Sequence, residues 1–183
     1  MYRLPVALLA AAMASGVSAK APVYDANISE AEVLAAQVAW CDALVAINKA
    51  GEEQGHAAAR KLAGEVIDAA YGYNLGPVLF KPTLAAAPQT FRTTREGAIS
   101  YFVGGDANFP GDSGFALKGW TACRADNAAI HINGDVATSM GNVMVTGKDG
   151  KVTTVDKTWT FKKSDDGKLR IVVHHSSLPY SAP

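Results

Sequence analysis

The chain has 183 residues, with 17 basic and 17 acidic side chains and therefore no formal net charge at neutral pH. Binding to nucleic acid needs a clustered surplus of Lys and Arg, so this balance argues against a nucleic-acid partner. Apolar residues make up 49% and charged residues 19% of the chain, which is typical of one globular domain and excludes an intrinsically disordered protein.

The N-terminus has the pattern of a secretory signal peptide. Arg3 gives a short basic start, residues 4–14 form an apolar run, and small residues at 17–19 suit cleavage after Ala19. A transmembrane helix needs about 20 apolar residues, so this run is too short to span a membrane, and no later run is longer. We therefore predict a signal peptide over 1–19, one domain over 20–183, no membrane span, and export across the inner membrane to the periplasm.

The two cysteines, Cys41 and Cys123, are too few for a disulfide framework, and no C-x-x-C motif is present. In an oxidising compartment the two thiols could form one disulfide. The alternative is that both are small buried apolar side chains. The sequence leaves this choice open.

The first half of the domain has helical periodicity. Two helices are expected to begin at capping boxes, one made by Ser29 and Glu32 and the other by Thr93 and Glu96. The expected elements are, in chain order, a helix from Ser29 to near Gly51, a helix over 54–71, a short strand over 78–80 and a short helix ending at Phe102.

The second half has the alternation of β-strands. Turn sequences at 133–134, 147–150 and 164–167 separate runs rich in Val, Ile, Thr and aromatic residues. We predict four consecutive antiparallel strands, over 120–132, 136–146, 152–163 and 168–177. Helices followed by a strand meander indicate an α+β fold, in which N-terminal helices pack on a curved, mostly antiparallel sheet and leave a conical cavity for a ligand.

The last strand carries the candidate functional side chains. Strict alternation from Leu169 places Ile171, Val173, His175 and Ser177 on one face, and that face is apolar until its end. We therefore expect His175 and Ser177 to face the cavity, and His174 and Ser176 to point the other way. Paired histidines at a strand end can also be ordinary surface or interface residues.

Metal-ligand spacing is poor in this sequence. Besides the neighbouring pair on the last strand, the histidines are His56 on a helix and His131 beside a turn, and no H-E-x-x-H motif occurs. A Ser-His-Asp triad could use Ser177 or Ser100, but the G-x-S-x-G motif of a nucleophile elbow is absent. We expect no cofactor, with zinc or manganese as the lesser possibility.

Several segments resemble the iota class of carbonic anhydrases, over roughly residues 40–180. The matching segments are LFKPT at 79–83, SYFVGG at 100–105, GFAL at 114–117 with Trp120, MGN at 140–142 and, most specifically, HHSSLP at 174–179. The resemblance implies the cone-shaped barrel of the nuclear transport factor 2-like superfamily. It also implies reversible hydration of carbon dioxide to bicarbonate and a proton, in a protein that is often a homodimer and works with or without metal.

Carried onto this chain, the resemblance implies a catalytic set of Thr83, Tyr101 and a His and a Ser of the last strand, which the alternation argument makes His175 and Ser177. The residues expected to line the substrate pocket are Phe80, Phe102, Trp159, His174 and Ser176. Two positions depart from the family pattern, because Val143 and Lys157 stand where aromatic residues are common. We expect these departures to alter the pocket wall or the subunit contact.

The expected chemistry needs no metal. Carbon dioxide is apolar and fits an apolar pocket, while a nearby base must take a proton from the attacking water. A histidine with an ordinary pKa near 6.5 suits that task at neutral pH, and this is the role expected of His175. The hydroxyl groups of Thr83, Tyr101 and Ser177 would orient the water and donate hydrogen bonds to the developing bicarbonate.

Other functions are compatible with the same fold. A cone-shaped α+β domain can bind a small molecule without catalysis, or it can serve as an oligomerisation module. Isomerase chemistry would need a buried carboxylate that faces Tyr101, and Asp156 is the nearest candidate in the sequence. The direction of the side chains on the last strand is expected to separate these alternatives.

Overall fold

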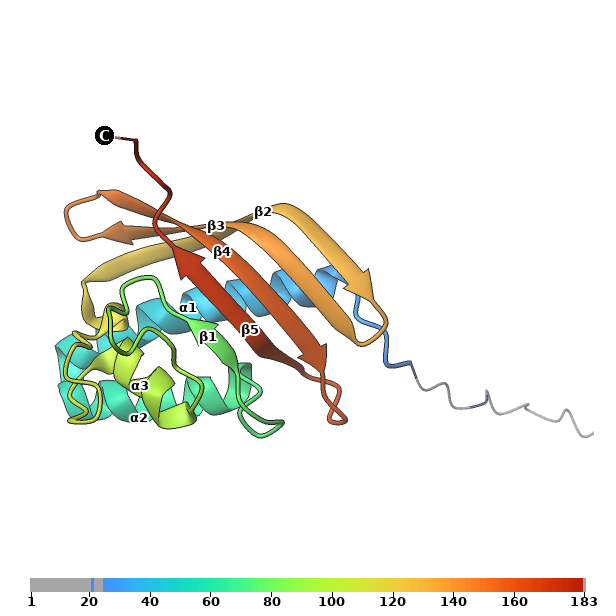
Figure 1. The fold of residues 1–183 in the computed structure, drawn as a ribbon, viewed down its shortest axis with the longest axis horizontal. Coiled ribbons are helices and arrows are strands. Elements are labelled where there is room, and N and C mark those ends of the chain that lie inside the picture. Colours follow the sequence, from blue (N-terminus) through green and yellow to red (C-terminus); the bar gives the residue numbers. More distant parts are fainter. Residues whose placement is uncertain (1–20, 22–24, 183) are drawn as a thin grey trace, which may run out of the picture.

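The computed structural model describes residue 21 and residues 25–182, so the predicted signal peptide over 1–19 lies outside the described residues. Helices pack on one side of a curved sheet (Figure 1). The elements in chain order are α1 (Glu30–Gln54), α2 (His56–Ala70), β1 (Leu79–Lys81), α3 (Arg95–Val103), a 3-10 turn (Phe115–Leu117), β2 (Trp120–Asn133), β3 (Val136–Gly147), β4 (Val152–Lys163) and β5 (Leu169–Ser177).

The five strands form one sheet in the order β1-β5-β4-β3-β2. Strands β2 to β5 are joined by short turns and pair antiparallel, whereas β1 lies parallel to β5. The predicted α+β class and the four-strand meander are confirmed. The sheet is open, with β1 and β2 at its two edges, so the cone is not a closed barrel.

Helix α1 begins where its sequence predicts. The Ser29 Oγ accepts a hydrogen bond from the backbone N–H of Glu32, and the Glu32 carboxylate accepts one from the backbone N–H of Ser29. Both halves of the capping box are therefore present. The helix ends at Gly55, whose φ of 86° lies in the left-handed region that favours glycine. Helix α3 differs slightly from its prediction, because Thr94 rather than Thr93 caps it, accepting from Gly97 N at 3.2 Å.

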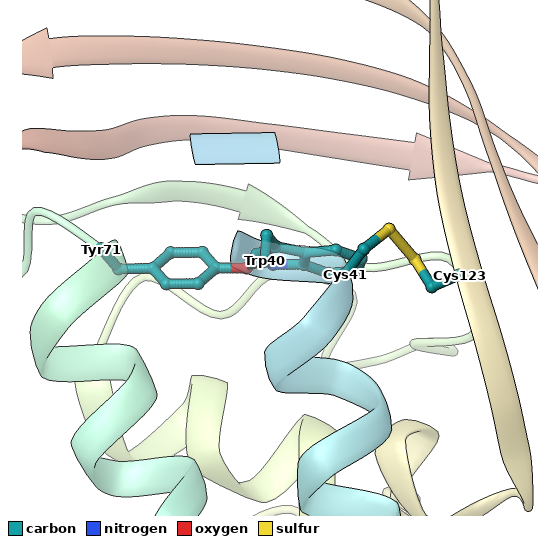
Figure 2. The surroundings of a disulfide bond; sticks show 4 residues. All are labelled: Trp40, Cys41, Tyr71 and Cys123. Carbon is teal, nitrogen blue, oxygen red and sulfur yellow. Dashed lines mark hydrogen bonds between the residues drawn. A yellow bond between two sulfur atoms is a disulfide. The ribbon is translucent and has the colours of Figure 1, made fainter. Parts of the chain in front are cut away.

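A disulfide joins helix α1 to strand β2. Cys41 and Cys123, which are 82 residues apart in sequence, are bonded and their Cα atoms are 5.1 Å apart. Figure 2 shows the neighbouring residue Trp40 with its indole next to the hydroxyl oxygen of Tyr71, the residue that follows helix α2. The question that the sequence left open is thus answered, and the bond fixes α1 beside the sheet at the level of Trp40.

The core fills the space between the helices and the inner face of the sheet. Helix α1 buries an apolar stripe that includes Val33, Trp40 and Leu44, and strands β4 and β5 bury Trp159, Phe161 and Ile171 against it. Within the described part of the chain, none of the helices is both long enough and apolar enough to cross a membrane.

Candidate functional site

At the end of β5, the side chains that point into the core are the two that strict alternation placed on the outer face. His174 and Ser176 are only 1% and 2% exposed, whereas His175 is exposed and Ser177 is half-buried. The prediction that His175 and Ser177 face the cavity is therefore wrong. One imidazole and hydroxyl pair does point inward, but it is the neighbouring pair.

A β-bulge causes this exchange of faces. Across β4, Phe161 pairs with Ile171, but the next residue back, Thr160, pairs with Val173, so Val172 is an extra residue on β5. An extra residue reverses the alternation beyond it. Leu169 and Ile171, before the bulge, pack in or against the core as predicted, whereas beyond it His174 and Ser176 are buried in place of His175 and Ser177.

Four buried side chains form a hydrogen-bonded chain that ends at β4. The Trp40 Nε1–H donates to Tyr71 Oη at 3.0 Å, and this oxygen lies 2.7 Å from His174 Nδ1. The other ring nitrogen of His174, Nε2, lies 2.5 Å from Lys157 Nζ. Both nitrogens of the imidazole are thus occupied by protein partners.

Burial shifts the pKa values of the titratable side chains in this hydrogen-bonded series. Loss of solvation lowers the pKa of His174 well below its ordinary value, with further lowering by nearby Lys157 and His175. Burial also lowers the pKa of the Lys157 amine and raises the pKa of the Tyr71 phenol. At neutral pH the imidazole of His174 is therefore uncharged and the neighbouring phenol of Tyr71 is protonated.

A group of three hydroxyls lies next to the imidazole. The Thr83 hydroxyl, just beyond β1, donates to Ser176 Oγ at 2.8 Å, and the Tyr101 hydroxyl of α3 accepts from the Leu84 backbone N–H at 3.4 Å. Burial raises the pKa of Tyr101, so its phenol keeps its proton and can donate it in a hydrogen bond. Ser176 and His174 share the inner face of β5, two residues apart, so the hydroxyl group and the imidazole are neighbours.

Aromatic rings enclose the imidazole of His174, and three of them are residues that were expected to line the substrate pocket. The ring of Phe80 stacks on His174 with centroids 4.3 Å apart, and Trp159 meets it edge-on at 5.8 Å. Phe102 packs behind Phe80 and Trp40. The Trp159 Nε1–H is buried and has no hydrogen-bond partner among the described residues, so it is free to donate to a bound oxygen atom.

The described residues do not gather a set of metal ligands. Within residue 21 and residues 25–182, no three His, Cys, Asp or Glu side chains lie close enough together to hold an ion. His174 is not available as a metal ligand, because Tyr71 and Lys157 already occupy both of its ring nitrogens. His56 is bonded at 2.8 Å to Val103 O, and His131 is exposed.

Asp156 does not reach the site. Its side chain is exposed on the outer face of β4, where Asn142 donates to it at 2.9 Å. The inner face of the same strand carries Val155, Lys157 and Trp159. An isomerase that needs a carboxylate facing Tyr101 therefore does not have it at Asp156.

The sequence did not point to Tyr71, and it pointed to Lys157 only as a change in the pocket wall or the subunit contact, not as a partner of His174. Tyr71 was assigned only the end of a helix, and nothing local in the sequence indicates that it reaches His174. Lys157 did leave a signal, because it alternates with Val155, Trp159 and Phe161, which all face the core. A lysine within a buried alternation is unusual unless a partner receives it.

Comparison with known proteins identifies relatives of this arrangement. The family model described as metal-independent carbonic anhydrase matches residues 31–178. A metal-independent carbonic anhydrase from Nostoc sp. (strain PCC 7120) is 61% identical over 163 residues, which cover 89% of this chain and 80% of that protein.

Two solved structures extend the comparison to the fold. The iota-carbonic anhydrase of a cyanobacterium, complexed with bicarbonate, is 60% identical and superposes with a TM-score of 0.88, covering 90% of this chain and all of that one. A Xanthomonas campestris protein described as a calcium/calmodulin-dependent protein kinase II association domain is 24% identical with a TM-score of 0.51, over 85% of this chain and 91% of that one. The second likeness shows a shared cone-shaped fold and nothing about activity.

Proposed function

The chain belongs to the metal-independent carbonic anhydrase family, and we propose that it catalyses the reversible hydration of carbon dioxide to bicarbonate and a proton without a metal. One observation carries the proposal. The hydroxyls of Thr83 and Ser176 are hydrogen-bonded to each other on the same inner face of the sheet as the buried imidazole of His174.

The reacting molecules would sit between these two groups. Two residues along a strand span about 7 Å, so the hydroxyl of Ser176 and the imidazole of His174 are close enough to contact the same small molecule. The rings of Phe80 and Phe102 make this part of the core apolar, as carbon dioxide requires. The hydroxyls of Thr83, Ser176 and Tyr101 would donate to the oxygens on which negative charge develops.

The imidazole of His174 would serve as the base, together with Lys157. Its lowered pKa keeps the imidazole uncharged at neutral pH, so the pair of His174 and Lys157 is able to take up a proton and releases it readily. The product is an anion, and a cation lies beside the hydroxyl group: Lys81 Nζ donates to the backbone oxygen of Ser176 at 3.0 Å. This charge would favour bicarbonate next to Ser176.

A relative supports the choice of product. The cyanobacterial iota-carbonic anhydrase that superposes on this chain was solved with bicarbonate bound. We propose that the same anion binds here at the hydroxyls of Thr83, Ser176 and Tyr101.

The test is a stopped-flow assay with a pH indicator, in which purified protein is mixed with dissolved carbon dioxide before and after exhaustive chelation. We expect equal acceleration over the buffer rate in both states. A rate equal to that of buffer in both states would remove the enzymatic proposal. Loss of activity only after chelation would remove the metal-free form of it.

We also propose that the protein is exported to the periplasm. The signal-like N-terminus and the disulfide between Cys41 and Cys123 support an oxidising compartment. Fractionation of the native cells is expected to recover the protein without residues 1–19 in the periplasmic extract. Recovery of full-length protein in the cytoplasm would contradict this.

We further propose a homodimer formed through the outer face of the sheet. Met140 is 60% exposed on this face, where a shallow groove runs past Asn142, Asp156 and His175. An apolar side chain on a strand surface of this kind suits contact with a second copy. Light scattering is expected to give twice the chain mass for the protein and the chain mass for Met140→Glu, and a monomeric native protein would refute the dimer.

A further inference from the structure

We propose that Lys157 is an uncharged amine that accepts a hydrogen bond from His174, and that it thereby acts as a positioning residue for this imidazole. The two side chains come from adjacent strands, Lys157 from β4 and His174 from β5, and they meet at 2.5 Å between Nζ and Nε2. Lys157 is 5% exposed and is the strand neighbour of Ser176. The hydrogen-bonding assignment does not depend on the proposed function, whereas the effect of Lys157 on catalysis rests on it.

The direction of the hydrogen-bonded chain determines where the hydrogens lie. An indole N–H can only donate, so Trp40 uses one lone pair of Tyr71 Oη. The phenolic hydrogen of Tyr71 then needs an acceptor, and among the described residues the other partner of this oxygen is His174 Nδ1. Nδ1 therefore carries a lone pair rather than a hydrogen.

The rest of the chain follows from this assignment. A neutral imidazole without hydrogen on Nδ1 carries it on Nε2, and this N–H points at Lys157 Nζ. An ammonium group has three donors and no lone pair, so it cannot accept from another N–H. Only the uncharged amine of Lys157 completes the chain.

The surroundings of Lys157 agree with an uncharged amine. No carboxylate forms an ion pair with Lys157 within the described residues. Among the described residues the titratable groups in the same hydrogen-bonded chain are His174, which contacts the amine, and Tyr71 beyond it, and neither is an anion at neutral pH. Helix α1 contributes the indole ring of Trp40. Burial accordingly lowers the pKa of the amine.

Contact with two indole rings is an interaction that would favour a charged Lys157. Lys157 Nζ lies 4.9 Å from the ring centroid of Trp40 and 5.1 Å from that of Trp159, positions that attract a cation. That attraction is small beside the cost of holding an unpaired ammonium out of water. The same rings pack equally well against an uncharged lysine.

The arrangement has a consequence for the proposed reaction. A proton taken up by the site would go to the lone pair of Lys157 Nζ, while the imidazole hydrogen moves from Nε2 to Nδ1, so that Nε2 accepts a hydrogen bond from the new ammonium group. Lys157 is also the register partner of Ser176, so this pair and the hydroxyl group lie on neighbouring strands. Lys157 would therefore determine at what pH the site can accept a proton.

The direct test is nuclear magnetic resonance on protein labelled with nitrogen-15 in its lysine and histidine side chains. We expect one lysine Nζ signal with the shift of a neutral amine at pH 8, absent in Lys157→Met and retained in Lys151→Met, which removes an exposed lysine. We also expect His174 to carry hydrogen on Nε2 and none on Nδ1. Ordinary ammonium signals for every lysine, or hydrogen on Nδ1 of His174, would overturn the proposal.

Activity supplies a second and separate readout. We expect Lys157→Met to lower kcat/KM at pH 8 at least about tenfold with little change in KM, because the base loses its partner. In the native protein, the acidic limb of the pH profile of kcat/KM should have its midpoint where the Lys157 signal titrates. In Lys157→Met this limb should move to a different pH. A profile that superimposes on that of the native protein would contradict the positioning role.

The two proposals fail in different ways. A neutral Lys157 signal in a protein that does not hydrate carbon dioxide would refute the proposed function and leave the hydrogen-bonding assignment standing. A protein that hydrates carbon dioxide with a charged Lys157 would refute this inference and leave the function standing.

Discussion

Helix α1 contributes to two buried polar clusters of opposite character. One turn before Trp40, the Gln37 amide donates to Asn127 Oδ1 at 2.9 Å and to Ser139 Oγ at 3.0 Å, while Asn127 donates back to Gln37 at 2.8 Å. This amide cluster contains no group that titrates near neutral pH. The second cluster, which starts at Trp40 and ends at Lys157, contains three titratable side chains in a row.

The difference teaches what a buried polar network is able to do. The amide cluster closes on itself, so it can bind the helix to the sheet but cannot hold a proton. The Trp40 to Lys157 chain ends in an amine whose protonation state can change, and it borders the hydroxyls of Thr83 and Ser176. The same core therefore holds one cluster for stability and one suited to acid–base chemistry.

The largest effect that separates the two clusters is expected from their buried serines. Ser176 and Ser139 are both 2% exposed and both accept a hydrogen bond from a side chain. Ser176→Ala should lower kcat/KM for carbon dioxide hydration about a hundredfold, as expected for loss of a donor to a developing oxyanion. Ser139→Ala should leave this rate constant nearly unchanged.

Thr83→Val gives a check on the serine result. Because Thr83 and Ser176 are bonded to each other, the double variant should lose less activity than the product of the two single losses. Equal losses for Ser139→Ala and Ser176→Ala would erase the distinction between the clusters.

A smaller effect is expected in stability. Here a substitution in the amide cluster should cost more than one in the Trp40 to Lys157 cluster. Gln37→Met should lower the free energy of unfolding by about 1–3 kcal/mol, because it leaves Asn127 and Ser139 without their partner. Lys157→Met should lower it less than Gln37→Met does, or raise it, because the substitution removes the cost of burying a deprotonated amine together with the hydrogen bond. Urea unfolding at pH 8 measures both, and a larger loss for Lys157→Met would show that this lysine is retained for stability.

The last expected effect is a difference in the pH dependence of stability. The unfolded chain holds a proton on Lys157 up to its ordinary pKa of 10.5, whereas the folded chain releases it far below. Unfolding therefore takes up a proton between these values, and native stability rises with pH from 7 to 9. Lys157→Met should flatten this rise by up to about 1.4 kcal/mol per pH unit.

Gln37→Met, which removes no titratable group, is the control for this slope. It should keep the slope of the native protein, and identical slopes in all three proteins would mean that Lys157 is charged in the folded state. Below pH 6.5, His174 adds a further loss of stability with acid, because its folded pKa is also depressed.

What the sequence predicted correctly depends on neighbours along the chain. The Ser29 and Glu32 capping box and the Asn133-Gly134 turn involve residues within a few positions, and both appear where they were expected. The catalytic roles of Thr83 and Tyr101, which come from the family resemblance, stay predictions; the structure shows Thr83 bonded to Ser176 and Tyr101 bonded to the Leu84 N–H.

What it predicted incorrectly depends on contacts across the fold. The bulge at Val172 adjoins Ile171, which pairs with Tyr71 and accepts a hydrogen bond from the Gly72 N–H at 2.9 Å, about a hundred positions away in sequence. Alternation along β5 contains no sign of this contact. One extra residue was enough to exchange the two histidine and serine pairs.

The central claim is that the inner pair on β5, His174 with Ser176, carries out the reaction, and the outer pair does not. The most direct test compares kcat/KM for carbon dioxide hydration in two double variants, His174→Gln with Ser176→Ala and His175→Gln with Ser177→Ala. We predict a loss of at least about a thousandfold for the inner double variant and activity close to that of the native protein for the outer one. Retained activity in the inner variant, or its loss in the outer one alone, would contradict the account.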